Sequence, residues 1–201
     1  MLDFSNSKIL IVGDVMLDKY YFGKVDRISP EAPVPIVNIQ KEESRLGGAS
    51  NVANNIVSLG GHSLLCGVIG HDLFGKEIER ISRHKNIDTF LLKTSSPTIT
   101  KARIIGGKQQ IVRVDYEDKS ELNADNKKLF RDTISRILPE YDILVISDYG
   151  KGLISEDLCR YLIKLAHKYD KKVIIDPKGK NWEKYSGADI VTPNVKELSD
   201  I

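Results

Sequence analysis

Short apolar runs alternate with amphipathic stretches along most of the 201-residue chain. The apolar runs have the length of strands, and the stretches between them repeat their apolar positions every three or four residues. This alternation is typical of a parallel β-sheet covered by helices, so the sequence predicts an α/β fold. Core strands are expected at 8–13, 63–70, 141–148, 171–177 and 188–194.

The amphipathic stretches predict four helices between these strands. The clearest lies at 155–169, where Leu158, Leu162 and Leu165 share one face and Ser155 can cap the first turn. The other three helices are expected at 51–59, 74–84 and 125–138.

Two segments, 19–43 and 98–117, break the alternation and look like paired strands outside the core sheet. The first carries Pro33 and Pro35 beside an apolar run, which suits an edge strand because proline donates no hydrogen bond. The second is expected to form a hairpin around the Gly-Gly pair at 106–107. Together they predict a small β-strand lid.

Composition excludes several classes of protein. The 30 Lys and Arg residues nearly balance the 28 Asp and Glu residues, so bulk charge does not favour nucleic acid or a membrane surface as a partner. The apolar runs are too short to cross a bilayer, and the N-terminus resembles no signal peptide, which favours the cytosol. Cys66 and Cys159 stand in apolar surroundings without metal-ligand spacing, so we expect buried thiols.

Polar residues follow every predicted core strand. Asp14, Asp72, Asp148, Asp176 and Asn194 each lie at or just after the end of one strand. Ligands of open parallel sheets bind at the carboxyl ends of the strands, so these residues point to a site along that edge. Singly, each is also an ordinary turn residue.

Gly47 and Gly48 directly precede a predicted helix, with Asn51 near its start. Backbone without side chains and exposed helix amides let a polar ligand approach closely. A glycine loop that only begins a helix is the alternative, and the sequence leaves both open.

Basic residues on the segments expected to close over this edge are candidates for binding phosphate. We single out Lys101 and Arg103 in the lid hairpin and Lys151 in the loop after the strand at 141–148. Each of them could instead belong to a solvated surface.

Two nucleotide-binding motifs are absent. The stretch at 70–77 matches Gly-x-x-x-x-Gly-Lys but places Glu77 where a P-loop has the hydroxyl that binds magnesium, and no Gly-x-Gly-x-x-Gly follows a strand. A P-loop site and a nicotinamide site are therefore not expected.

Asn194 and Glu197 stand three residues apart after the last predicted strand. Such a pair can cap a helix, with each side chain accepting a hydrogen bond from the other residue's backbone amide. It can also present oxygen atoms to a ligand, and the spacing alone does not decide between the two.

Taken in order, the motifs resemble those of the ribokinase-like, or PfkB, carbohydrate kinases. They are ILIVGDVMLDKYYFGKVDRISPEAPVPIV, GGASNVANNIVSLG, PTITKARII, QQIVRVDYE, VISDYGKG, IDPKG and TPNVKEL. Within that family they look like the kinases of D-glycero-β-D-manno-heptose 7-phosphate. The resemblance implies a ribokinase-like fold and transfer of a phosphoryl group from ATP, with Mg²⁺, to the anomeric hydroxyl, in ADP-heptose and lipopolysaccharide core synthesis. It also implies the cytoplasm of a Gram-negative bacterium.

The resemblance also assigns residues by motif. Asp18, five positions after Gly13, matches the aspartate that binds sugar hydroxyls in the family, and Gly47, Gly48 and Asn51 match the segment that contacts the sugar. The stretch Asn194, Val195, Lys196 and Glu197 matches the family motif associated with Mg²⁺ and ATP phosphates, with Glu197 as the metal-linked residue. Because the implied substrate already carries a phosphate, Lys101, Arg103 and Lys151 are candidates for binding that phosphate.

One family segment does not occur in these 201 residues. The glycine-rich stretch that supplies the catalytic base has no match, so we expect residues 1–201 to form the N-terminal part of one sugar-kinase domain, inactive alone. The C-terminal part of the fold is then absent. A homodimer through the lid is a further expectation. A kinase for another sugar or sugar phosphate, and a non-catalytic sugar- or nucleotide-binding protein, remain the alternatives.

Overall fold

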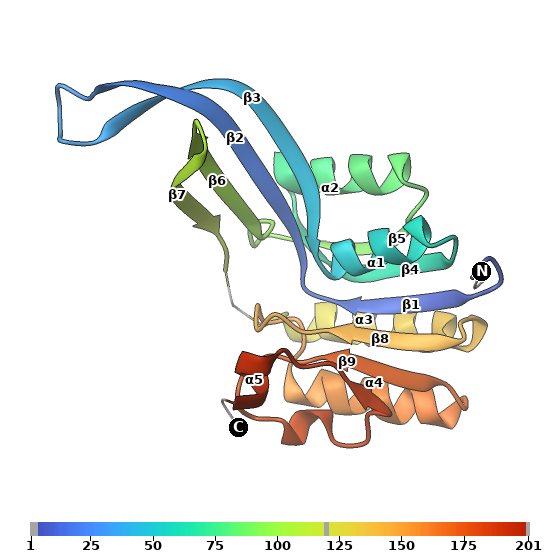
Figure 1. The fold of residues 1–201 in the computed structure, drawn as a ribbon. Coiled ribbons are helices and arrows are strands. Elements are labelled where there is room, and N and C mark those ends of the chain that lie inside the picture. The colour runs from blue at the N-terminus through green and yellow to red at the C-terminus, as the bar shows by residue number, and fades with distance from the viewer. Residues whose placement is uncertain (1–3, 119–120, 200–201) are drawn as a thin grey trace.

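The computed structural model describes residues 4–118 and 121–199, which form a three-layered α/β core and a separate β-sheet that projects from it (Figure 1). The core sheet has six strands in the order β10-β9-β8-β1-β4-β5, and every neighbouring pair is parallel. Its strands are β1 (Lys8–Gly13), β4 (His62–Gly70), β5 (Asp88–Thr94), β8 (Ile143–Ser147), β9 (Lys172–Asp176) and β10 (Ile190–Val191). All carboxyl ends therefore meet at one edge.

Helices cover both faces of this sheet (Figure 1). One face carries α1 (Ala49–Ser58) and α2 (Leu73–His84), and the other carries α3 (Ala124–Ile137) and α4 (Glu156–Lys168). Short elements η1 (Leu138–Glu140), η2 (Glu183–Tyr185) and α5 (Val195–Ser199) complete the structure.

The period-two alternation of β1 divides the core into two clusters. Leu10 and Val12 pack into the cluster under α3 and α4, whereas Ile11 packs under α1 and α2. All three side chains are fully buried, as expected for a central strand of a parallel sheet. A buried sheet of this kind is a rigid base for the loops at its carboxyl edge.

The predicted core elements are confirmed with two differences. All four helices begin and end within two residues of their predicted limits, and four strands match closely. The apolar pattern did not predict β5, an edge strand that is only partly buried and has only a short apolar run of Phe90, Leu91 and Leu92. It also made the last strand too long, because β10 has only two residues, Ile190 and Val191.

The lid is a four-stranded sheet in the order β3-β2-β6-β7. It consists of β2 (Val15–Ile28), β3 (Pro35–Gly48), β6 (Thr100–Gly106) and β7 (Gln109–Tyr116). Pro35 starts the edge strand β3, and Gly107 takes a positive φ of 62° in the turn between β6 and β7. Both features agree with the prediction, although the long strands begin and end further toward the core than the predicted 19–43.

In the ranges that the structure describes, no helix is both long and apolar enough to cross a membrane. Cys66 and Cys159 are buried, free thiols in the core, as expected. Burial raises the pKa of both thiols, that of Cys159 to about 12.

Candidate functional site

The Gly-Gly pair forms the junction between the lid and α1. Gly48 is the residue before the helix and adopts φ 56° and ψ −137°, a conformation that only glycine takes readily. A methyl group there would lie 2.4 Å from the backbone oxygen of Asp14, and one on Gly47 would lie 2.5 Å from Oδ2 of Asp18. The two glycines thus allow the lid strand, the helix start and the Asp18 carboxylate to approach closely.

A cavity of about 610 Å³ lies at this junction, between the lid and α1. Six of the seven residues predicted to bind substrate line it: Asp18, Gly47, Gly48, Asn51, Lys101 and Arg103. They come from β2, β3, α1 and β6, so segments more than fifty residues apart in the sequence meet here. The seventh, Lys151, lies elsewhere.

Asp18 and Arg103 form the centre of the cavity's polar surface. Asp18 pairs with Lys101 in the register of β2 and β6, and Arg103 lies two residues further along β6 on the same face. The Arg103 Nη1 atom donates to Asp18 Oδ1 at 2.6 Å, and both side chains are about four-fifths buried. The carboxylate keeps Oδ2 for a ligand, which is the arrangement a sugar hydroxyl requires.

Sequence reasoning missed several residues of this cavity. They are Tyr20, Arg45, Asn54, Lys85 and Tyr149. The cross-strand pairing of Asp18 with Arg45 would have revealed one of them, because the alternation of β2 and β3 puts both side chains on one face. Lys85, at the end of α2, gives no signal in the sequence.

The cavity is strongly cationic. Arg45, Lys85, Lys101 and Arg103 line it, and Asp18 is the one carboxylate among its described lining residues. The Lys101 Nζ atom lies 5.9 Å from the centre of the Tyr149 ring, which closes the side of the cavity next to the sheet edge. A ligand with hydroxyl groups and a phosphate fits this set of side chains.

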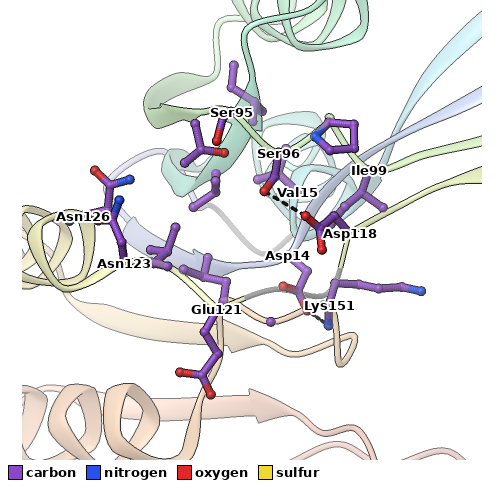
Figure 2. A pocket seen from close by; sticks show the side chains of 17 residues that line it. Asp14, Val15, Ser95, Ser96, Ile99, Asp118, Glu121, Asn123, Asn126 and Lys151 are labelled. Carbon is purple, nitrogen blue, oxygen red and sulfur yellow. Dashed lines mark hydrogen bonds between the residues drawn. The ribbon is translucent and has the colours of Figure 1, made fainter.

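Lys151 lines a second, smaller cavity of about 220 Å³ at the same sheet edge (Figure 2). Figure 2 shows its side chain extending away from that cavity, and Lys151 Nζ pairs with Glu117. Three acidic residues, Asp14, Asp118 and Glu121, line the second cavity, but Figure 2 shows the Glu121 carboxylate turned away from it, and Lys127 pairs with that carboxylate. Lys151 therefore does not line the larger cavity with Lys101 and Arg103, although Lys101 and Lys151 both lower the pKa of Asp115.

Asp14 and Asp148 hold the backbone of the sheet edge. Asp14 is 2% exposed, and its Oδ2 atom accepts from the amides of Tyr149 at 2.8 Å and Lys151 at 3.1 Å. Burial raises the pKa of Asp14, and the nearby Asp148 raises it further, while the two amides oppose this. Asp148 accepts from the Gly150 amide at 2.7 Å and from the Tyr185 hydroxyl at 2.7 Å. Neither carboxylate faces the cationic cavity.

Asp72 also has a structural role. It caps α2 by accepting from the Gly75 amide at 2.7 Å, and it accepts from both the amide and the hydroxyl of Thr98. This ties the start of α2 to the segment that leads into β6. The polar residues at the strand ends thus serve largely to fix the loops around the site.

Asn194 and Glu197 form the expected capping pair at the start of α5. The Glu197 amide donates to Asn194 Oδ1 at 2.9 Å, and the Asn194 amide donates to Glu197 Oε2 at 3.1 Å. Lys178 Nζ binds Glu197 Oε1 at 2.8 Å, and this ion pair lowers the pKa of Glu197. Val195 and Lys196 are exposed on the same short helix.

Oxygen donors gather next to this helix start. Burial raises the pKa of Asp176, and the negative charge of Glu197 raises it further. In the part of the chain that the structure describes, no group of three acidic, His or Cys side chains could hold a metal alone. A hydrated Mg²⁺ that also binds phosphate oxygens suits such a sparse set of hard donors.

Tyr149 connects the two halves of the site. Its ring lines the cationic cavity. Burial raises the pKa of its phenol, and the negative charges of Asp176 and Glu197 raise it further. The Asp18 carboxylate of the cavity acts on the same phenol and also raises its pKa.

A parallel α/β sheet with a projecting β-lid, and a polar cavity between them, defines a class of proteins that enclose a small ligand at the sheet edge. The sequence profile of the pfkB family carbohydrate kinases matches residues 6–201. The chain belongs to this family, and its ribokinase-like fold agrees with the expectation from the motifs.

Two relatives show the extent of the similarity. The chain is 48% identical over 193 residues to the bifunctional protein HldE of Helicobacter pylori, covering 95% of this chain and 42% of that protein. It is 44% identical over 197 residues to a D-beta-D-heptose 7-phosphate kinase of Bordetella bronchiseptica, covering 98% of this chain and 62% of that enzyme. The chain thus spans less than two thirds of each relative.

Solved structures agree on the fold. Phosphofructokinase-2 from Escherichia coli, in its tetrameric inhibited form, superposes with a TM-score of 0.74 at 21% identity, over 96% of this chain and 63% of that one. A phosphofructokinase-like protein from Staphylococcus aureus superposes with a TM-score of 0.76 at 15% identity, over 96% and 60%. At these identities the likeness establishes the fold alone.

Proposed function

We propose that the chain provides the sugar-binding part of an ATP-dependent kinase for D-glycero-β-D-manno-heptose 7-phosphate. The reaction transfers the γ-phosphoryl group of ATP to the anomeric hydroxyl and yields the 1,7-bisphosphate, in the synthesis of ADP-heptose for the lipopolysaccharide core. Residues 1–201 then form the N-terminal part of one kinase domain. Both substrates would be phosphorylated metabolites, which favours the cytoplasm as the compartment. The role in lipopolysaccharide synthesis favours a Gram-negative bacterium.

The observation that carries the proposal is the charge of the 610 Å³ cavity, which combines one carboxylate with four cationic side chains. A neutral sugar needs the carboxylate but has no use for so many cations. A sugar phosphate needs both, because its hydroxyls donate to a carboxylate and its dianion binds ammonium and guanidinium groups. The names of the two relatives, which share 44–48% of their aligned residues with this chain, favour heptose 7-phosphate among sugar phosphates.

Each predicted residue that lines the cavity receives a role in this proposal. Asp18 binds sugar hydroxyls, and Gly47, Gly48 and Asn51 form the surface against which the sugar ring lies. Lys101 and Arg103 bind the substrate phosphate. Phosphoryl transfer depends mainly on positioning and electrostatic stabilisation, so these residues contribute by fixing the acceptor and excluding water.

Asn194, Val195, Lys196 and Glu197 would lie on the ATP side, with Glu197 holding Mg²⁺ through water. The negative charges of Asp176 and Glu197 favour binding of a cation next to the start of α5. In the free protein the Lys178 ammonium group is that cation. When bound, Mg²⁺ neutralises charge on the phosphates of ATP. The capping pair keeps Glu197 in one orientation in the meantime.

Binding is the property to measure, since the family's glycine-rich aspartate segment does not occur in these 201 residues. Isothermal titration of the chain with heptose 7-phosphate should show one site. Asp18→Asn should weaken that binding about 100-fold, because it replaces the acceptor of two hydroxyl hydrogen bonds with an amide. Glu121→Gln, which removes a carboxylate from a residue that lines the second cavity and not the larger one, is the matched control.

Three outcomes of this titration would contradict the proposal. They are the absence of binding, equal losses in Asp18→Asn and Glu121→Gln, and tighter binding of an unphosphorylated sugar than of heptose 7-phosphate. The last result would favour a kinase for another sugar.

The outer lid supports a homodimer as part of the proposal. Large apolar side chains on β2 and β3 are exposed there, among them Val25, Ile28 and Ile39, and exposed apolar patches favour association. Sedimentation velocity at micromolar concentration should show a dimer. A monomer under these conditions would contradict this part of the proposal.

A further inference from the structure

Arg45 lies in the cationic cavity opposite Asp18, and no motif in the sequence points to it. The two residues pair directly in the antiparallel register of β2 and β3, so their side chains share the face of the lid that lines the cavity. The Arg45 side chain is 61% exposed. A ligand that enters the cavity can reach it without any rearrangement of the core.

Arg45 and Arg103 flank the same aromatic ring. The guanidinium carbon of Arg45 lies 4.9 Å from the centre of the Tyr20 ring, and that of Arg103 lies 5.1 Å from it. Since both distances are measured to one point, the two guanidinium carbons lie at most about 10 Å apart, so a phosphate group bound beside the Tyr20 ring can accept from both once the arginine side chains turn toward it. Contact with the ring restricts the orientation of each planar group.

Both arginines have donors to spare. Arg45 Nη2 donates to Glu43 Oε2 at 2.7 Å, and Arg103 Nη1 donates to Asp18 Oδ1 at 2.6 Å. An arginine carries five N–H donors in one plane, so a bond through one nitrogen atom leaves others for a ligand. Arg103 can thus hold Asp18 in place for the sugar while it also binds an anion.

The partner of Arg45 does not depend on it. Glu43 is also paired with Lys41, whose Nζ lies 2.6 Å from Oε1, and both cations lower the pKa of Glu43. If Arg45 turned from Glu43 to an incoming phosphate, Lys41 would still neutralise the carboxylate. The exchange therefore leaves no unpaired charge on this face of the lid.

We propose that Arg45, together with Arg103 across the Tyr20 ring, binds the phosphate group of the sugar phosphate and makes the cavity select phosphorylated sugars. The inference deepens the proposed function and rests on it for the identity of the sugar. It assigns the distal phosphate to the lid strands β2, β3 and β6. When the ligand binds, Lys41, which does not line the cavity, stays paired with Glu43 and neutralises its carboxylate.

The test compares two ligands and two neighbouring variants. Isothermal titration of the 201-residue chain with heptose 7-phosphate and with unphosphorylated heptose gives both affinities for the wild type, Arg45→Gln and Lys41→Gln. Arg45→Gln should weaken binding of the 7-phosphate about 10- to 100-fold and leave the unphosphorylated sugar within about twofold. Lys41→Gln, which breaks the other ion pair of the same carboxylate, should leave both affinities nearly unchanged. Arg45→Lys should restore part of the loss, because it keeps the charge and loses the fork of donors.

Equal weakening of both ligands in Arg45→Gln would overturn the inference, because the residue would then act on the sugar or on the fold. No weakening of the 7-phosphate would overturn it as well. If the wild type binds neither heptose ligand, the proposed function fails, and titration with inorganic phosphate followed by ³¹P NMR then decides the inference. Phosphate binding that is lost in Arg45→Gln supports the anion subsite, and absence of phosphate binding to the wild type overturns it.

Discussion

The two cavities at the carboxyl edge of the sheet differ in charge although they share their position in the fold. The larger one, between the lid and α1, is lined by four cations and one carboxylate among the described residues. The smaller one, on the side of β4 and β5, is lined by three acidic residues and by Lys151, and Figure 2 shows the Glu121 carboxylate and the Lys151 side chain turned away from it. Position alone marks both as ligand sites, but charge makes only the larger suitable for a sugar phosphate.

The difference arises from the elements that supply the side chains. The lid strands β2, β3 and β6 contribute Asp18, Arg45, Lys101 and Arg103, whereas the acidic residues of the smaller cavity come from the end of β1 (Asp14) and from positions between β7 and α3 (Asp118 and Glu121). In the core, Asp14 serves the backbone by accepting from two amides. In the proposed function the lid therefore carries residues that recognise the ligand, whereas Asp14 at the sheet edge keeps the loops in place.

The largest effect is expected where the lid meets the core. Gly48→Ala should lower the free energy of unfolding by about 3 kcal/mol or more, because it forces φ 56° on a residue with a Cβ and places that atom against the Asp14 backbone oxygen. Gly107→Ala, with φ 62° and open space around the Cβ position, should cost only about 1 kcal/mol. Urea unfolding of both variants measures the difference. Equal costs would mean that the junction is not tightly packed around the larger cavity.

The second prediction compares Lys101, which lines the larger cavity, with Lys151, which lines the smaller one. Lys101→Gln should weaken binding of heptose 7-phosphate about tenfold, since Lys101 lines the cationic cavity. Lys151→Gln should have the smaller effect, because its ammonium group pairs with Glu117 and Lys151 does not line the larger cavity. Titration of both variants gives the two affinities. A larger loss in Lys151→Gln would show that the loop at 149–152 closes over the ligand and would break the comparison.

The smallest effect concerns the pH dependence of Asp14. Its pKa is raised in the folded protein, mainly by burial, so the folded state binds this proton more tightly than the unfolded state. The contribution of Asp14 to stability is therefore lost as pH rises from about 4 through the folded pKa. Asp14→Asn removes this pH-dependent contribution to stability. The melting temperature of the variant minus that of the wild type should therefore become more positive between pH 4.5 and pH 7. A difference that stays constant over this range, or decreases, would contradict the assignment.

The sequence predicts the core better than the site. Buried strands such as Ile9–Val12 show continuous apolar runs, and a helix such as α4 shows its periodicity and its cap, so both can be located from the chain alone. The edge strands β5 and β10 were missed or misjudged because one lies half exposed and the other has two residues. The pattern of apolar residues in a sequence reflects burial, and these two strands are little buried.

Site residues could be predicted only where a motif or a strand end marked them. Asp18 and the Gly-Gly pair were found through their motifs, and the cavity brings them together. Arg45 and Tyr149 were missed because their position depends on how β3 pairs with β2 and on how the loop after β8 folds onto Asp14. Strand register and loop geometry involve contacts between distant segments, which a pattern along one chain does not contain.

The attachment of the lid has a practical consequence. The long strands β2 and β3 leave the core side by side, with Val15 paired to Gly48 and the Ala49 amide bound to the Asp14 oxygen at 3.0 Å. Their far end, around residues 29–34, makes its described backbone contacts within the hairpin itself, such as Ser29 to Val34. A fluorescent label or a short insertion at this tip would therefore leave the ligand-binding surface intact. The tip is the place from which movement of the lid could be observed in the working protein.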